Sequence, residues 1–60
     1  MSFKEGDRVK LYEVNDRGDR YYTDHWVITR VLDNDYYRLI HRVTGAVTWS
    51  TGDSLKLDIV

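Results

Sequence analysis

Few residues of this chain have the types and spacing that catalysis or metal binding would need. His25 and His41 are the only imidazoles among 60 residues, and there is no cysteine to join them as a ligand or nucleophile. Ser50, Thr51 and Ser54 lack the paired flanking glycines that expose a catalytic serine on a sharp turn. Two histidines among scattered carboxylates match no metal-binding pattern. We therefore expect a protein that is not an enzyme and that uses no metal or cofactor.

An adhesion motif is spelled out in "DRGDRYYT", residues 16–23, which contains Arg17-Gly18-Asp19. Integrins read that tripeptide, but three residues are too short to be specific in a chain with so many arginines and aspartates. Gly18 between charged residues also suits the tip of a loop, because glycine adopts positive φ without strain. We expect a plain turn at this point.

Aromatic and arginine side chains are the better candidates for a binding surface, because Tyr, Trp and Arg are enriched at the energetic centres of protein interfaces. Neighbouring residues of a strand point to opposite faces, so one tyrosine of each adjacent pair is left outside the core. Trp26 and Trp49 are expected in the core, since an indole buries a large apolar area. The predicted protein-binding residues are Tyr21, Tyr22, Tyr36, Arg38 and Arg42.

The basic residues offer an alternative, because arginines beside aromatics can hold phosphates while bases stack on the rings. Against it, the chain has nine basic and ten acidic residues and a net charge of −1, whereas nucleic-acid binders usually show a basic surplus. The alternative therefore needs a local patch. The predicted phosphate contacts are Lys10, Arg30, Arg38, Arg42 and Lys56.

The pattern that must position these residues is that of a small all-β domain. Apolar and polar residues alternate with a period of two, and glycine, aspartate and asparagine interrupt the alternation often. The predicted strands cover 8–14, 25–32, 36–43, 46–50 and 55–60, with a long loop over 15–23 and a short 3₁₀ turn over 51–54. Curling such strands into a small barrel buries one face and reduces exposed edges. The predicted core is Val9, Leu11, Trp26, Ile28, Val31, Leu32, Leu39, Ile40, Val47, Trp49, Leu55, Leu57 and Ile59.

Four segments carry a family resemblance: "EGDRVKL" (5–11), the W-x-I-x-x-V-L pattern (26–32), "YYRLIHRVTGAVTWS" (36–50) and "DSLKL" (53–57). In this order they resemble the SH3-like barrels of KOW, Tudor-like and integrase C-terminal domains. The resemblance covers nearly the whole chain and implies one domain, residues 1–60, folded as a closed five-stranded barrel. "KLYEV" (10–14) is also similar to the ALYDY stretch of peptide-binding SH3 domains, although this chain has no proline to shape a PxxP groove.

These observations favour a binding module. We expect a small accessory or regulatory protein that binds another protein, of the kind that phages and mobile elements often encode. A nucleic-acid-binding barrel and a self-associating structural subunit, a homo-oligomer, are the alternatives. No apolar stretch follows the first residues as it would in a signal peptide, and no apolar run is long enough to span a membrane. We therefore expect a cytoplasmic protein without a membrane partner.

Overall fold

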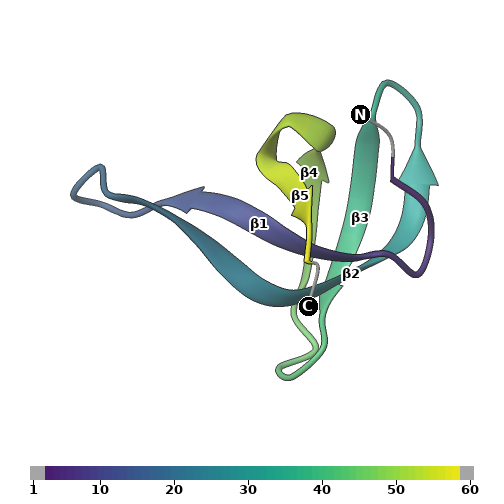
Figure 1. The fold of residues 1–60 in the computed structure, drawn as a ribbon, viewed down its shortest axis with the longest axis horizontal. Helices are drawn as coiled ribbons and strands as arrows, with labels where there is room; N and C mark the ends of the chain where they lie inside the picture. The colour runs from purple at the N-terminus through teal and green to yellow at the C-terminus, as the bar shows by residue number, and fades with distance from the viewer. Residues whose placement is uncertain (1–2, 59–60) are drawn as a thin grey trace.

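The computed structural model describes residues 3–58, which form one antiparallel sheet of five strands (Figure 1). The sheet order is β4-β3-β2-β1-β5. The all-β class, the five strands and a 3₁₀ turn before the last strand are confirmed. The elements are β1 (Arg8–Val14), β2 (Arg20–Leu32), β3 (Tyr36–His41), β4 (Val47–Thr51), the 3₁₀ turn η1 (Gly52–Ser54) and β5 (Leu55–Leu57).

The tight turns contain residues that tolerate a left-handed backbone. Asn34 and Asp35, between β2 and β3, have φ angles of 61° and 55°. Asparagine and aspartate adopt this region more readily than other residues with a side chain. Between β3 and β4, Gly45 takes φ of 78° and donates its N–H to the carbonyl of His41 at 2.9 Å. These residues therefore end one strand and start the next within a few positions.

The Arg17-Gly18-Asp19 tripeptide lies in the turn that joins β1 to β2, as expected. The side-chain oxygen of Asn15 accepts the backbone N–H groups of Arg17 at 2.9 Å and Asp19 at 3.0 Å. Gly18 has φ of 84° and donates its N–H to the carbonyl of Asn15 at 2.9 Å. An asparagine that bonds its own backbone a few residues ahead is a common way to build a turn. The local chemistry thus accounts for the tripeptide as a hairpin tip.

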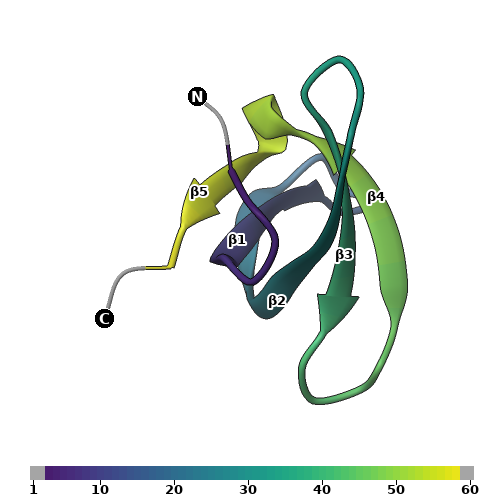
Figure 2. The ribbon, with the colours of Figure 1, turned by 90° about the vertical axis from the view of Figure 1, so that its right-hand side faces the viewer.

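β2 is 13 residues long and bends at two irregularities in its pairing. One extra residue of β2 lies opposite Lys10 of β1, where His25 takes φ of 73°. A second extra residue, Thr29, shifts the register between β2 and β3. Bulges of this kind bend a strand and increase its twist. β2 therefore pairs with β1 through its first part and with β3 through its second, and the sheet curls (Figure 2).

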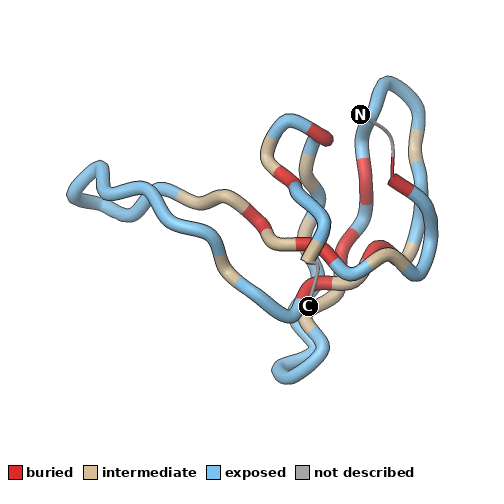
Figure 3. Tube along the Cα trace, in the orientation of Figure 1, coloured by how far each residue is buried: buried red, intermediate tan, exposed pale blue. Residues whose placement is uncertain are grey.

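The inner face of the curled sheet holds the core. Val9, Ile28, Tyr37 and Leu39 are the largest fully buried side chains. Phe3 packs edge to face on Tyr37, with ring centroids 5.6 Å apart. Figure 3 shows buried segments in the middle of the sheet and an exposed β1–β2 hairpin tip. The buried set is Phe3, Val9, Leu11, Trp26, Ile28, Tyr37, Leu39 and Leu55.

The sheet is not closed, which corrects the predicted closed barrel. β4 and β5 are its two edge strands, and no pairing within residues 3–58 joins them. β5 is only three residues long and pairs with β1 alone, from Val9 to Leu11. So short a strand covers one edge of β1 but does not extend far enough to close the sheet. The SH3-like character of the fold stays a prediction.

The first hairpin is longer and its loop shorter than predicted. The turn occupies residues 15–19 rather than 15–23, because β2 already begins at Arg20. Tyr22 pairs with Tyr12 in the β1–β2 register, and their rings meet edge to face at 5.4 Å. Such cross-strand aromatic pairs stabilise a β-ribbon. The two strands therefore continue past the core as an arm, residues 12–22, which projects away from β3 and β4 (Figure 1).

The predicted core was partly wrong. Val31, Val47, Trp49 and Leu57 are exposed, and Leu32 and Ile40 are half-buried. Phe3, which is absent from the predicted core, is buried, and Tyr37 is the buried member of its pair, as strand alternation predicts. Tyr21 and Tyr22 are both exposed, which corrects the expectation that one of them serves the core. Ile59 lies outside the described residues. The largest single error is Trp49, which sits on the outer side of an edge strand.

Candidate functional site

The outer side of the sheet carries arginine and tryptophan side chains in one row. Along β3, Tyr37 and Leu39 point to the core, so Arg38 between them points outward. Arg38 pairs with Arg30 of β2 on one side and with Trp49 of β4 on the other. Residues directly opposite in an antiparallel sheet share a face. Arg30, Arg38 and Trp49 therefore form one cross-strand row, which we call the central row.

A flanking row lies on each side of the central row and extends it into a continuous surface. One row is Leu32, Tyr36 and Thr51, and the other is Arg8, Val27, Ile40 and Val47. Trp49 is its most prominent residue, with 52% of its surface exposed. Tyr36 and Val47 are exposed as well, although both are large and partly apolar. We call the residues of the three rows the outer face: Arg8, Val27, Arg30, Leu32, Tyr36, Arg38, Ile40, Val47, Trp49 and Thr51.

The outer face is positively charged and contains no acidic residue. Residues 3–58 form one ion pair, in which Lys10 Nζ lies 3.4 Å from Asp24 Oδ1, and neither Arg30 nor Arg38 takes part in it. Arg30 and Arg38 lie directly opposite one another, and like charges in that position destabilise a sheet. An anionic group bound between the two guanidinium groups would remove this repulsion.

The free edge of β4 adjoins the outer face. Within the described residues β4 pairs with β3 only. His41 donates its N–H to the carbonyl of Ala46 at 2.8 Å, and bonded pairs alternate along an antiparallel ladder. By that alternation the backbone groups of Val47, Trp49 and Thr51 point to the free edge. β4 contains no charged residue, glycine or proline, and its pairing with β3 is regular, so it lacks the devices that usually protect an edge strand.

The structure brings together some of the predicted protein-binding residues and separates others. Tyr36 and Arg38 lie on the outer face. Tyr21 and Tyr22 lie on the arm, far from β3 along the molecule (Figure 1). Arg42 follows the end of β3 in the turn to β4, with its backbone N–H donated to the carbonyl of His25 at 2.7 Å.

The predicted phosphate contacts likewise fall into separate groups. Arg30 and Arg38 are neighbours in the central row. Lys10 and Lys56 are directly opposite one another in the pairing of β1 with β5. Lys10 is paired with Asp24, and Lys56 Nζ lies 4.2 Å from the ring centroid of Tyr22. The two lysines therefore already have partners within the fold.

A hydrogen-bonded cluster around Asp35 holds one end of the outer face in place. Tyr37 Oη donates a hydrogen bond of 2.6 Å to Asp35 Oδ1, and the N–H of Phe3 donates to the same hydroxyl at 3.1 Å. The hydrogen bond to Asp35 raises the pKa of Tyr37, the Phe3 N–H opposes that effect, and burial adds to it. Gly52 donates its N–H to the Asp35 carbonyl at 2.9 Å. These bonds fix the end of β4 beside the start of β3.

Position 52 requires glycine because a side chain would not fit there, and not because of its backbone angles. A Cβ atom built at Gly52 would lie 2.7 Å from Asp35 Oδ1 and closer still to Oδ2. Since the Asp35 carboxylate is held by Tyr37, it has little freedom to move aside. The absence of a side chain at position 52 thus allows η1 to pack against the β2–β3 turn.

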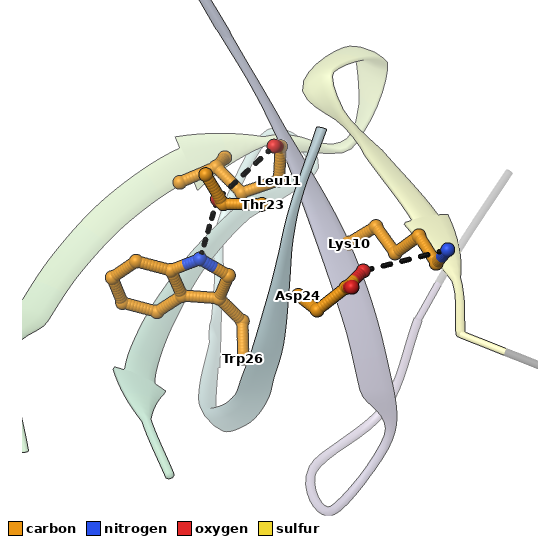
Figure 4. A network of polar contacts seen from close by, with 5 residues as sticks. All are labelled: Lys10, Leu11, Thr23, Asp24 and Trp26. Atoms are coloured by element: carbon orange, nitrogen blue, oxygen red, sulfur yellow. Dashed lines mark hydrogen bonds and ion pairs between the residues drawn. The ribbon is translucent and has the colours of Figure 1, made fainter. Parts of the chain in front are cut away.

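The second tryptophan, Trp26, is a core residue, and its prediction is confirmed. It is only 8% exposed, and its Nε1 donates a hydrogen bond of 2.8 Å to Thr23 Oγ1 (Figure 4). The Thr23 hydroxyl in turn donates to the carbonyl of Leu11 at 3.3 Å. Figure 4 also shows the Lys10–Asp24 ion pair on the neighbouring part of the same strands. The two indoles of this chain therefore have opposite roles.

The histidines contribute to the β3–β4 turn. Their ring centroids are 6.0 Å apart, and His41 Nδ1 accepts the N–H groups of Val43 and Thr44, each at 3.2 Å. Within residues 3–58 no three potential metal-ligand side chains gather. No pocket is found in that part of the chain either. Any ligand of the described residues would therefore meet an open surface rather than a cavity.

Trp49 is the functional candidate that the sequence prediction missed. The signal was present in the register of the 36–50 hairpin. Once the turn at residues 42–46 is fixed, Trp49 faces Arg38 and not Leu39. Counting strand alternation from that turn would have placed the indole with the arginines, outside the core.

Comparison with known proteins identified no relative from which a function could be inferred. A scan against protein-family models found no match, and a search of curated proteins found no relative. Among the residues that the structure describes, no helix has the length and apolar character needed to cross a membrane.

Proposed function

We propose that this protein is a non-enzymatic binding module that recognises another protein through the outer face and the free edge of β4. The observation that carries the proposal is the exposed indole of Trp49 on an uncharged edge strand. Trp49, Tyr36 and Arg38 are the expected anchors, because Trp, Tyr and Arg contribute most to binding energy at protein interfaces. An accessory or regulatory role and an SH3-like barrel identity remain part of this proposal.

The proposed mode of recognition is strand addition. An extended segment of the partner would pair with the backbone groups of Val47, Trp49 and Thr51 and extend the sheet by one strand. Main-chain hydrogen bonds supply affinity in this mode, and alternate side chains supply specificity. The side chains of the added strand that share a face with Trp49 would pack against the indole. This arrangement uses the free edge of β4, which neither charge nor irregular pairing protects.

The composition of the outer face favours protein over nucleic acid as the partner. Val27, Ile40 and Val47 form an aliphatic row beside the central row. Protein–nucleic acid interfaces are more polar and more positively charged than interfaces between proteins. Nucleic acid nevertheless remains the alternative, because Trp49 beside Arg38 could also support base stacking next to a phosphate.

The proposal is tested by affinity capture from a lysate of cells that produce the protein, with matched variants as bait. Trp49→Ala and Arg38→Gln should lose a specific bound protein that the wild type retains. Tyr21→Ala removes a similarly exposed aromatic from the arm and serves as the control. Retention by the Trp49 and Arg38 variants, with loss by Tyr21→Ala, would overturn the proposal in favour of Tyr21, one of the binding residues predicted from sequence.

Self-association is a second candidate, and the same edge favours it. β4 is uncharged, so two copies could pair through it without charge repulsion. A lysine in place of Thr51 would place a charge at that edge, a device by which natural proteins block edge pairing. A molar mass from light scattering that falls from dimer to monomer in Thr51→Lys would support this candidate. A monomeric wild-type protein would eliminate it.

A further inference from the structure

We infer that the segment recognised by the outer face is acidic. In this arrangement Arg38 binds its carboxylates, Arg30 adds positive charge behind Arg38, and Trp49 packs against its chain. This inference rests on the proposed function of the same face. It adds the chemistry of the partner, which a general protein-binding role does not specify.

The first argument is the uncompensated charge of the central row. Arg30 and Arg38 are exposed and directly opposite, and no residue of the outer face is acidic. The one ion pair of residues 3–58 involves Lys10 and Asp24. Opposed like charges cost a sheet stability unless something of opposite sign lies between them. Guanidinium groups bind carboxylates through paired, charge-assisted hydrogen bonds, which makes a carboxylate a fitting ligand for this pair.

The second argument separates carboxylates from the phosphates that arginine also binds. Asp33 lies in the turn next to Leu32, and Asp53 lies in η1 two residues after Thr51. Both therefore flank the cross-strand row of Leu32, Tyr36 and Thr51. A phosphate chain that continued along the outer face would meet these two acids. The whole chain has a net charge of −1, which gives little general attraction for a polyanion. A short acidic peptide can end before it reaches them.

The third argument concerns the shape of the ligand. The free edge of β4 suits an extended chain, in which every second side chain points to the same face. Acidic residues at alternate positions would all lie on the side of Trp49 and Arg38. A suitable probe is therefore a capped peptide of about five residues, the length of β4, that alternates glutamate and threonine.

The test is an NMR titration that follows the two indole N–H signals of the protein. The Trp49 signal reports on the outer face. The Trp26 signal is the internal reference, because its N–H is bonded to Thr23 in the core. The glutamate–threonine peptide is compared with a glutamine–threonine peptide of the same length, with inorganic phosphate and with oligothymidylate. The matched protein variants are Arg30→Gln/Arg38→Gln on the outer face and Arg17→Gln/Arg20→Gln on the arm.

The expected result is a saturable shift of the Trp49 signal with the glutamate peptide, and no shift of the Trp26 signal. Affinity should fall by about tenfold or more in Arg30→Gln/Arg38→Gln, because charged hydrogen bonds are lost, and stay unchanged in Arg17→Gln/Arg20→Gln. Well-dispersed spectra of both variants would show that they remain folded.

Three outcomes would overturn the inference, and each has a different consequence for the proposed function. Equal binding of the glutamine peptide would keep strand addition and remove acid recognition. Tighter, strongly salt-dependent binding of oligothymidylate would point to nucleic acid instead. No shift with any probe would reject an acidic ligand, while the lysate capture with Trp49→Ala would still decide whether the outer face binds a protein.

Discussion

Arg38 and Trp49 lie directly opposite one another in the pairing of β3 with β4, on a face that contains no acidic residue. The residue next to Arg38, Leu39, is fully buried on the other side of the same strand. One short hairpin therefore supplies both part of the core and the centre of the outer face. Substitutions of its outward residues should leave the protein folded, whereas substitutions of its inward residues should destabilise it.

The two tryptophans should differ sharply in their contribution to stability. Trp49→Ala is expected to change the free energy of unfolding by about 0.5 kcal/mol or less, as surface substitutions usually do. Trp26→Ala should cost about 3–5 kcal/mol, because it leaves a cavity in a small core. Urea unfolding followed by circular dichroism measures both. Comparable losses for the two variants would show that Trp49 is a core residue after all.

The hydroxyl of Thr23 should be essential for the burial of Trp26. Thr23→Val keeps the side-chain shape but leaves the indole N–H without its 2.8 Å acceptor. An unsatisfied buried donor costs about 1–3 kcal/mol, so the urea midpoint should fall accordingly. Thr23→Ser retains the hydroxyl and is the control. If the valine and serine variants were equally stable, the hydrogen bond would have no measurable role.

Alkaline pH should weaken the fold through Tyr37. Its pKa is raised above the ordinary tyrosine value of 10.0, chiefly by the hydrogen bond to Asp35, so the folded state holds the phenol proton more tightly than the unfolded state. The resulting stability is complete below that ordinary value and is lost as pH rises through the raised pKa. Thermal unfolding across this range should show a decline that Tyr37→Phe abolishes and Tyr36→Phe preserves. An unchanged pH profile in Tyr37→Phe would contradict this assignment.

A methyl group at position 52 should destabilise the protein through Asp35. The Cβ of Gly52→Ala would clash with the Asp35 carboxylate, and overpacking of this kind costs about 1–3 kcal/mol. Asp35→Ala removes the clashing group but also the partner of Tyr37. In the double variant the two losses should therefore be less than additive. Strict additivity of the two losses in urea unfolding would mean that the residues do not meet.

Strand positions followed from the sequence wherever turn residues and period-two alternation agreed. β1 was placed at 8–14, as found, and the 3₁₀ turn before the last strand was anticipated. Asn34 and Asp35 marked the end of β2 because both tolerate a left-handed backbone. These features are local, and local chemistry decides them.

The errors arose where long-range contacts decide the outcome. The start of β2 depends on the cross-strand pair of Tyr12 and Tyr22, which lies beyond the reach of local turn signals. Phe3 is buried because it packs on Tyr37 and donates its backbone N–H to the Tyr37 hydroxyl, and the strand pattern does not show this contact. Trp49 was assigned to the core from its size alone. The outer face could be recognised only after the register between β3 and β4 was known.

The measurement that tests the central claim most directly is residue-resolved amide hydrogen exchange of β4. In the free protein the N–H groups of Trp49 and Thr51 should exchange fast, because they point to the open edge. Those of Thr48 and Ser50 should exchange slowly, because they face β3. With a captured partner protein or the glutamate peptide bound, Trp49 and Thr51 should become protected. Unchanged fast exchange of both amides in the complex, with protection appearing on the arm instead, would contradict the account.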